Sequence, residues 1–516
     1  MEIYKHEMVN KINFESCHTL TSITETNIGP FGAIKLLEAE DGSLELVKDG
    51  GEFIKSIQFI HPTAILIGRA GLSQKKAHYD GVCSMISFID GLLEQSEYKL
   101  SEGVHPRIIV KGIEDAREAA IKVLDEIALP LPSSRSDLKD IISSSSLTKS
   151  KVNVSDVIMD AINCVKVENQ PIDLDRIEIM KIKCLQESVR LVKGLVIEQG
   201  FRHELMAKRM KNVAILVLNV SLEAESTIVS TYMPVANFDE RERMTLAERR
   251  FVDDKLKSII ELRSAIDGDF LLVNGKGIDG PSMDILSRAK ISALRRVSKK
   301  NITRLVYGCK CRVVNCVDDI DPDVLGFAGS VVEEDYKGTK YIFIDEVKDP
   351  KAVTIVISGM TQTVSSLTES AVKSGIYAIK NAYKDNKILP GAGATEIALN
   401  LKLNEMKKNI QPKNRIGFEV FAEALLSIPR ALINNAGLDS STIISEMLNE
   451  GESDLAGVDL DTGEVIDPTI FGIYDNYGVI RNIIQAAPII ASQLLLVDEI
   501  IQSDKEKKEK KEEEDK

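Results

Sequence analysis

The stretch Tyr79-Asp80-Gly81-Val82-Cys83 has the residue types of a loop that could hold a phosphate group and a divalent cation. The carboxylate of Asp80 is a ligand that Mg²⁺ accepts, and Gly81 has no side chain to keep a phosphate from the backbone. A firm grip on phosphate would need hydroxyls at the next two positions, but Val82 has none and the Cys83 thiol is a weak donor. The stretch therefore predicts a nucleotide site with a reduced capacity for turnover.

Four other segments could contact the same ligand, and each has a simpler explanation. Ile28-Gly29-Pro30-Phe31-Gly32 is a rigid turn with exposed amides, or only the end of a helix. Lys48-Asp49-Gly50-Gly51 is a turn with a carboxylate at its tip, and alone it is no more than a turn. Pro390-Gly391-Ala392-Gly393-Ala394 opens a helix whose N-terminus favours anions, or is a plain loop-to-helix transition. Asp475 could accept ribose hydroxyls, or simply cap the last helix.

Composition and charge exclude other classes of protein. The net charge of −14 argues against a general nucleic-acid binder. Seven cysteines without framework spacing are typical of reduced thiols in the cytoplasm. Cys309, Cys311 and Cys316 could suggest zinc, but no fourth ligand lies nearby and strand packing explains them better. No signal pattern is present and no apolar run reaches the ~20 residues that span a bilayer, so we expect a cytoplasmic protein without a membrane partner.

The elements that must position these residues follow from hydrophobic periodicity. The first 130 residues predict helices and one hairpin, residues 33–37 and 44–47 around Asp41-Gly42, and the break at residues 130–134 marks a boundary. Helices are expected over residues 61–70, 85–100, 104–129, 138–165 and 174–188.

From about residue 194 the pattern changes to an α/β domain over about 196–356. Its polar stretch 226–237, followed by the charged run 239–243, predicts a projecting segment. Strands are expected over 213–220, 270–273, 304–307 and 312–317, and helices over 239–265 and 283–297.

After Gly359 the helical style returns, so we expect one helical domain made from both chain ends with the α/β part inserted between them. Residues 458–466 predict a second hairpin, and the charged tail 503–516 is expected to be disordered. Helices are expected over 365–383, 394–406, 418–436 and 476–501.

The order of the motifs along the chain resembles that of the group II chaperonins over about residues 8–502. These motifs are Gly29-Pro30-x-Gly32, Lys48-Asp49-Gly50, His61-Pro62, Asp80-Gly81, Gly103-x-His105-Pro106, Gly391-Ala392-Gly393-Ala394 and Gly457-Val458-Asp459. Longer segments resemble the zeta class of the eukaryotic cytosolic chaperonin, CCT or TRiC. They are 247–254, 276–279, 293–296 and 474–477.

This resemblance implies a multidomain α+β chaperonin fold. Both chain ends would form a mostly helical equatorial domain that binds ATP, and a small intermediate hinge would join it to an inserted α/β apical domain. A helical protrusion from Ser226 to about Ala265 would serve as a lid over bound substrate. The implied bounds are 1–133 and 390–502 for the equatorial domain, 134–193 and 358–389 for the hinge, 194–357 for the apical domain and 503–516 for the tail.

The resemblance also implies a role for each site residue. Asp49 would lie near the γ-phosphate as a catalytic carboxylate, Asp80 would bind Mg²⁺ and Asp475 would meet the ribose of ATP or ADP. The residues implied in nucleotide binding are Gly29, Pro30, Asp49, Gly50, Gly81, Val82, Cys83, Ser84, Thr148, Lys149, Gly391, Gly393 and Asp475. Implied partners are seven paralogous subunits in an eight-membered ring, stacked as a double ring, and unfolded client proteins, with no nucleic acid.

Departures from the family pattern gather at the phosphate end of the site. The family motif Gly-Asp-Gly-Thr-Thr has Tyr79 as its first residue here, and Val82 and Cys83 as its last two. Each lost hydroxyl or charged contact is worth ~1–3 kcal/mol, and a lost general base costs ~10²–10⁴ in rate. Further departures are Phe31 and Ile480 for lysines, Lys75-Lys76 for an acidic pair and Ser370 for the carboxylate that orients the attacking water.

We therefore expect a subunit of an ATP-dependent double-ring chaperonin whose own site hydrolyses ATP weakly or not at all. Two alternatives stay open. The retained Asp49 and Asp80 could support a slow but active ATPase, or the chain could be a stand-alone protein-binding module that reuses the chaperonin fold.

Overall fold

The computed structural model describes residues 2–5, 7–38, 42, 44–132, 134–150, 152–167, 170–223, 238–408, 410–451 and 455–502. The chain divides into two compact units, which are described separately. The first contains residues 1–158 and 366–516, and the second contains residues 159–365. The first unit therefore contains both chain ends, and the division into equatorial, hinge and apical domains stays a prediction. The predicted projecting stretch 226–237 and the tail 503–516 lie outside the described residues.

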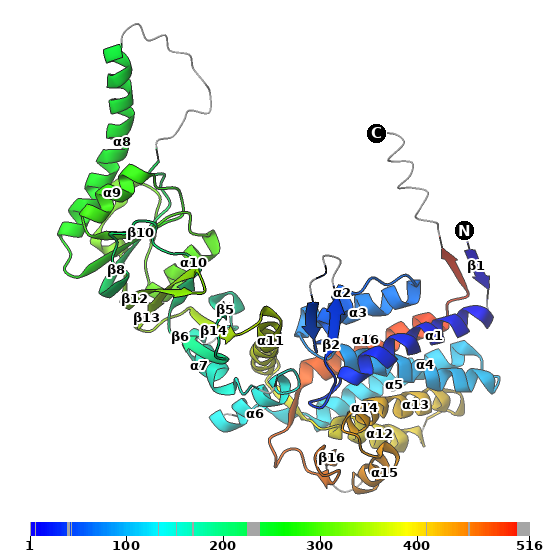
Figure 1. The fold of residues 1–516 in the computed structure, drawn as a ribbon. Helices are drawn as coiled ribbons and strands as arrows, with labels where there is room; N and C mark the ends of the chain where they lie inside the picture. Colours follow the sequence, from blue (N-terminus) through cyan, green and yellow to red (C-terminus); the bar gives the residue numbers. More distant parts are fainter. Residues whose placement is uncertain are drawn as a thin grey trace. The chain divides into compact units, whose positions relative to one another are not determined.

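A helical bundle forms the core of the first unit (Figure 1). Its long members are α1 (Glu7–Thr24), α4 (Val82–Ser101), α5 (Pro106–Ile127), α13 (Pro412–Leu425) and α16 (Tyr477–Leu495). On α5, buried residues recur at helical spacing from Ile109 to Leu124, so one face of this helix enters the core. Helices α5 and α13 meet backbone to backbone, because a Cβ added to Gly112 would lie only 2.8 Å from Gly417 Cα. Larger residues at these positions would force the two helices apart.

The first unit contains further helices and strands beside this bundle. The predicted hairpin is present as β2 (Lys35–Glu38) and β3 (Leu44–Val47), an antiparallel pair. The strand β15 (Lys387–Pro390) joins segments far apart in sequence, because it pairs with both β4 (Leu129–Pro130) and β18 (Tyr474–Asn476). The other elements are α2 (Gly50–Ser56), α3 (Pro62–His78), α6 (Arg135–Ser146), α11 (Gln362–Asp385), α12 (Ala394–Lys407), α14 (Ser427–Asn435), α15 (Ser440–Glu450), β1 (Glu2–Lys5), β16 (Gly457–Val458), β17 (Val465–Ile466) and β19 (Glu499–Gln502). Helix α7 (Ser155–Val165) begins in the first unit and lies mostly in the second.

Helix α16 is the one helix among the described residues that is long and apolar enough to cross a membrane by length and composition. A share of 61% of its most apolar window is buried within the protein. Ile483, Ile484 and Ala487 of this helix belong to the hydrophobic core of the first unit. The structure thus uses α16 as a core helix, which agrees with the buried helix predicted for this part of the sequence.

The second unit contains a seven-stranded sheet in the order β10-β9-β8-β12-β13-β7, with β11 beside β8. Its neighbouring strands β8 (Arg209–Leu218), β9 (Asp269–Asn274) and β10 (Ile291–Leu294) are parallel. Such strands are buried on both faces, which explains their continuous apolar runs. The remaining elements are β5 (Ile177–Lys183), β6 (Ser188–Val192), β7 (Leu195–Ile197), α8 (Phe238–Ser264), α9 (Gly280–Arg288), α10 (Lys299–Cys309), β11 (Val313–Val314), β12 (Gly326–Tyr336), β13 (Thr339–Asp345) and β14 (Val353–Gly359).

Three secondary-structure predictions in this unit are wrong. Residues 304–307 belong to α10, which Ser298 begins by accepting a hydrogen bond from Asn301 N–H. Most of the predicted helix 174–188 is the strand β5, and β6 begins at its last residue; both strands pair with the distant β14. The predicted helix 283–297 ends at Arg288, and residues 291–294 form β10 beside β9. In the last two cases pairing with a distant strand overrides local preference.

Candidate functional site

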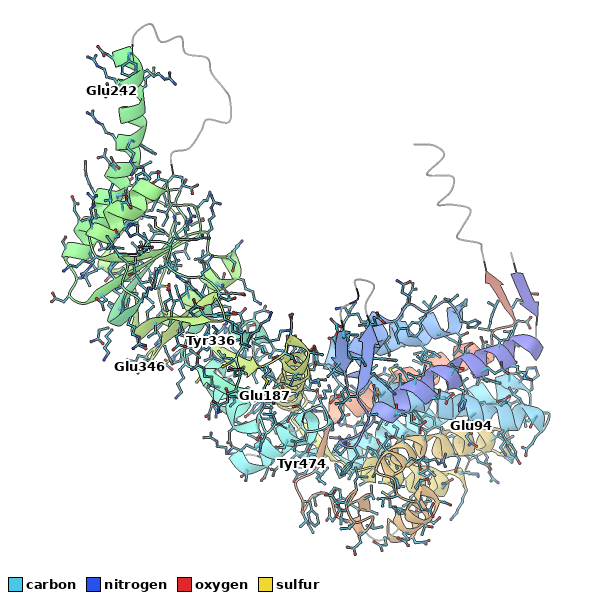
Figure 2. All side chains as sticks on the ribbon, viewed as in Figure 1. Glu94, Glu187, Glu242, Tyr336, Glu346 and Tyr474 are labelled. Atoms are coloured by element: carbon cyan, nitrogen blue, oxygen red, sulfur yellow. The ribbon has the colours of Figure 1, made fainter. Side chains whose placement is uncertain are left out.

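A cavity of about 590 Å³ lies in the first unit. Its walls come from segments widely separated in sequence, namely the turn after α1, the loop between α3 and α4, the end of α6, the start of α12 and the start of α16. Tyr474 on β18, labelled in Figure 2, also lines it. Predicted site residues that line it are Gly29, Pro30, Asp49, Gly50, Asp80, Gly81, Val82, Cys83, Ser84, Thr148, Lys149, Gly393 and Asp475.

Two predicted residues are not among those that line the cavity. Gly391 is buried, and its N–H donates to the backbone oxygen of Ile473 at 3.0 Å. Ser370 lies on α11, one turn before Ser374. Their roles stay predictions.

The Asp80 loop connects two helices through left-handed backbone. Tyr79 ends α3 with φ of 63°, and Gly81 begins α4 with φ of 78°. Asp80 accepts hydrogen bonds from Gly81 N–H at 3.0 Å and from Ser145 Oγ at 3.1 Å. The first N–H groups of a helix are unpaired within it, so the start of α4 favours an anion in the cavity.

Val82 and Cys83 occupy the two positions at which a firm grip on phosphate would need hydroxyls. Val82 is 3% exposed and belongs to the hydrophobic core. Cys83 lies against Gly50, because a Cβ added to Gly50 would come within 2.2 Å of Cys83 Sγ. Burial, followed by the charge of Asp49, raises the pKa of the Cys83 thiol to about 12. The thiol therefore stays neutral and can give a phosphate only a weak hydrogen bond.

Asp49 is held by two lysines. Its Oδ2 lies 2.7 Å from Lys75 Nζ, its Oδ1 accepts from Gly51 N–H at 3.1 Å, and Lys149 Nζ is 4.0 Å from Oδ1. Burial alone would raise the pKa of Asp49, but the charges of Lys149 and Lys75 outweigh it and the pKa is lowered. Asp49 is thus a firmly ionised carboxylate at only 5% exposure of its side chain.

Lys149 links this carboxylate to the Asp80 loop. Its ammonium lies 3.5 Å from Asp80 Oδ1 and donates to Ser374 Oγ at 2.7 Å. Burial disfavours its charge, yet Asp49 and Asp80 together raise its pKa, so Lys149 stays protonated. The neighbouring Thr148 uses its hydroxyl to donate to Ser145 O at 2.7 Å. Of these two residues predicted from the hinge, Lys149 is the one that faces both carboxylates.

The ring of Tyr79, which stands where the family motif has glycine, does not line the cavity. It stacks on Tyr377 of α11, with ring centroids 4.7 Å apart and planes 13° apart. The ammonium groups of Lys75 and Lys149 lie 5.0 and 5.9 Å from its centroid. Tyr79 is not among the cavity-lining residues. It instead ties the Asp80 loop to α11 and adds cation–π contacts with both lysines.

Glu396 and Asn27 are among the cavity residues that sequence reasoning missed. Glu396 is 4% exposed in the first turn of α12, and burial raises its pKa to about 7. Burial, then Glu396 and Asp80, raise the pKa of Asp475 to about 8. Asn27 is 6% exposed, and its two amide atoms have no hydrogen-bond partner within the described part of the chain. The first-turn position of Glu396, directly after the glycine-rich turn, was the available signal.

These features define what the site could do chemically. The start of α4 and Lys149 suit a phosphate, and the half-exposed Asp80 suits Mg²⁺, which is often held by one or two carboxylates plus phosphate. Among the described residues no cluster of three or more acidic, histidine or cysteine side chains could enclose a metal alone. Neither of the two positions that the resemblance assigns to catalysis suits a general base, because Asp49 is ion-paired and position 370 is serine.

Comparison with known proteins finds chaperonin sequences that match nearly the entire chain. The sequence model of the TCP-1/cpn60 chaperonin family matches residues 20–505. The T-complex protein 1 subunit zeta-2 of Homo sapiens is 36% identical over 513 residues, which cover 97% of each chain. The protein of the same name from Mus musculus is 34% identical over 513 residues, again 97% of each chain.

Proposed function

Because the chain belongs to the TCP-1/cpn60 chaperonin family and resembles its zeta subunits, we propose that it is one subunit of a ring-shaped chaperonin in the cytoplasm. Seven paralogous subunits complete an eight-membered ring, and two rings stack. The assembly encloses unfolded proteins and folds them at the expense of ATP. The cavity of this subunit binds ATP or ADP but hydrolyses ATP weakly or not at all.

The state of Asp49 carries the proposal of weak hydrolysis. A general base works best when its pKa lies near the working pH, but the charges of Lys149 and Lys75 lower the pKa of Asp49. Its Oδ2 accepts a hydrogen bond from Lys75 Nζ at 2.7 Å, and its Oδ1 accepts one from Gly51 N–H at 3.1 Å. Both oxygens are therefore engaged and less available to take a proton from water. The position that would orient the attacking water holds Ser370, whose hydroxyl is a poor base near neutral pH.

Nucleotide binding is supported by groups of the cavity that do not depend on the substituted side chains. The N–H groups at the start of α4 need no side chain to contact a phosphate, so they survive the loss of both threonines. Lys149 adds a protonated ammonium at the same end. When Mg²⁺ is bound, it would supply charge neutralisation for the phosphates, and Asp80 is the residue that would hold it. Asp475 and Glu396 supply polar groups elsewhere in the cavity.

The test is the ATPase rate of the assembled ring with Asp80→Ala in this subunit alone. We expect that rate to equal that of the unmodified ring, because this subunit adds little hydrolysis. The exposed Asp321→Ala in the second unit is a matched control for expression and assembly. A fall by a full subunit's share of the ring's activity, in Asp80→Ala only, would show that the site turns over.

A slow but active ATPase is the second candidate, because Asp49, Asp80 and Lys149 are all present at the cavity. It would be supported by measurable phosphate release from rings in which every other subunit has been disabled by substitution. The absence of release above that of a fully disabled ring would exclude it.

A further inference from the structure

Lysines and carboxylates balance at the phosphate end of the cavity. The carboxylates are Asp49, Glu52 and Asp80, and the lysines are Lys48, Lys75 and Lys149. Glu52 and Lys75 do not line the cavity themselves, and Lys75 acts on it through its ion pair with the lining residue Asp49. Lys75 Nζ lies 2.7 Å from both Asp49 Oδ2 and Glu52 Oε1. Lys149 Nζ faces Asp80 and Asp49, and Lys48 Nζ donates to Pro30 O at 2.8 Å. An arriving phosphate therefore meets Asp49 and Asp80 as lysine-paired charges rather than as bare carboxylates.

Lys75 is the residue that sets this balance. Its side chain runs directly over the backbone of α2, since a Cβ added to Gly51 would lie 2.2 Å from Lys75 Cδ. Only 11% of its side chain is exposed, so solvent screens its charge weakly. An acidic residue at this position would face Asp49 and Glu52 with a third negative charge. A site of that kind would need an external cation before it could accept a polyphosphate.

We propose that nucleotide binding at this site does not require a divalent cation, because Lys75 supplies within the protein the positive charge that a metal would otherwise bring. This inference rests on the proposed binding of ATP or ADP in the cavity. It concerns whether a cation is needed, and it leaves Asp80 able to hold Mg²⁺ when that ion is present. The ligand it predicts is a purine nucleoside diphosphate or triphosphate without bound metal.

The experiment measures the affinity of the purified full-length chain for a fluorescent ADP, in buffer with excess EDTA and in buffer with Mg²⁺. We expect dissociation constants that agree within about threefold, a difference below 1 kcal/mol. Lys75→Gln removes one charge near the phosphates and should weaken binding in EDTA by on the order of tenfold. Lys75→Asp should weaken it further, while Mg²⁺ should restore part of the affinity in both variants.

Three controls separate charge from loss of structure. Lys76→Asp makes the same charge change at an adjacent exposed position and should keep binding in EDTA. Lys75→Arg keeps the charge and should keep most of the affinity. Circular dichroism and the unfolding midpoint of each variant show whether the chain is folded. The comparison of EDTA with Mg²⁺ on the unmodified chain needs no variant at all.

The outcomes distinguish a failure of this inference from a failure of the proposed nucleotide binding. Binding of the unmodified chain in Mg²⁺ but not in EDTA would overturn the inference and leave the proposed nucleotide site intact. A lack of binding in both buffers would overturn the nucleotide site itself, and the inference with it. Equal weakening by Lys75→Asp and Lys76→Asp in EDTA would refute the specific role of Lys75.

Discussion

Glu396→Gln should stabilise the protein at alkaline pH, because this buried carboxyl resists ionisation. Its pKa lies at about 7 instead of the ordinary 4.5, with burial as the cause. In the unfolded chain it ionises near its ordinary pKa, while in the folded chain it keeps its proton. The folded state then binds more protons than the unfolded state, so stability falls as pH rises from about 4.5 to 7 and is level above that.

The size of the effect follows from this difference. At 1.36 kcal/mol for each pH unit between the two pKa values, the loss approaches roughly 3 kcal/mol above pH 7. Glutamine has nearly the same shape and does not ionise, so the variant should escape this loss.

The assay is denaturant unfolding at a series of pH values from 5 to 8.5, followed by a signal from the first unit. The stability of Glu396→Gln relative to the unmodified chain should rise by about 2–3 kcal/mol across this series. The exposed Glu405→Gln on the same helix is the matched control and should show no such rise. Parallel curves for Glu396→Gln and the unmodified chain would refute the reasoning.

Two further substitutions each test a contact that lies within one of the two units. Tyr79→Ala should lower the stability of the first unit by ~1–2 kcal/mol through loss of the Tyr377 stack, whereas Tyr79→Phe should change it by less than about 0.5 kcal/mol in the same unfolding assay. Glu178→Gln should lower the melting temperature of the second unit and cost ~3 kcal/mol, since it leaves the buried guanidinium of Arg304 without its ion-pair partner. An unchanged melting temperature would contradict the reasoning for Arg304.

Helices and the site could be predicted from sequence where the signal is local. Periodic apolar residues gave α4, α5, α11 and α12 within a few residues, and glycine-rich turns gave the segments that meet at the cavity. The strand at residues 177–183 could not be found this way, because it pairs with residues 353–359, whose position depends on the whole second unit. The residues of a strand do not by themselves identify the distant strand with which it pairs.

The chemistry of the site shows the same limit. The loss of hydroxyls at Val82 and Cys83 was visible in the sequence, but the direction of the Tyr79 ring was not. That direction depends on Tyr377, almost three hundred residues later. Likewise, Lys75 could be noted as an unusual cation, but its 2.7 Å contact with Asp49 follows from how α2 packs on α3. Long-range packing therefore decides which departures from a family pattern matter.

High-resolution imaging of the native assembly, frozen after incubation with ATP and Mg²⁺, tests the central claim most directly. This subunit's cavity should contain an intact triphosphate at the start of α4 while neighbouring subunits contain diphosphate. An empty cavity would contradict nucleotide binding, and a diphosphate in this cavity, as in the neighbouring subunits, would contradict weak hydrolysis.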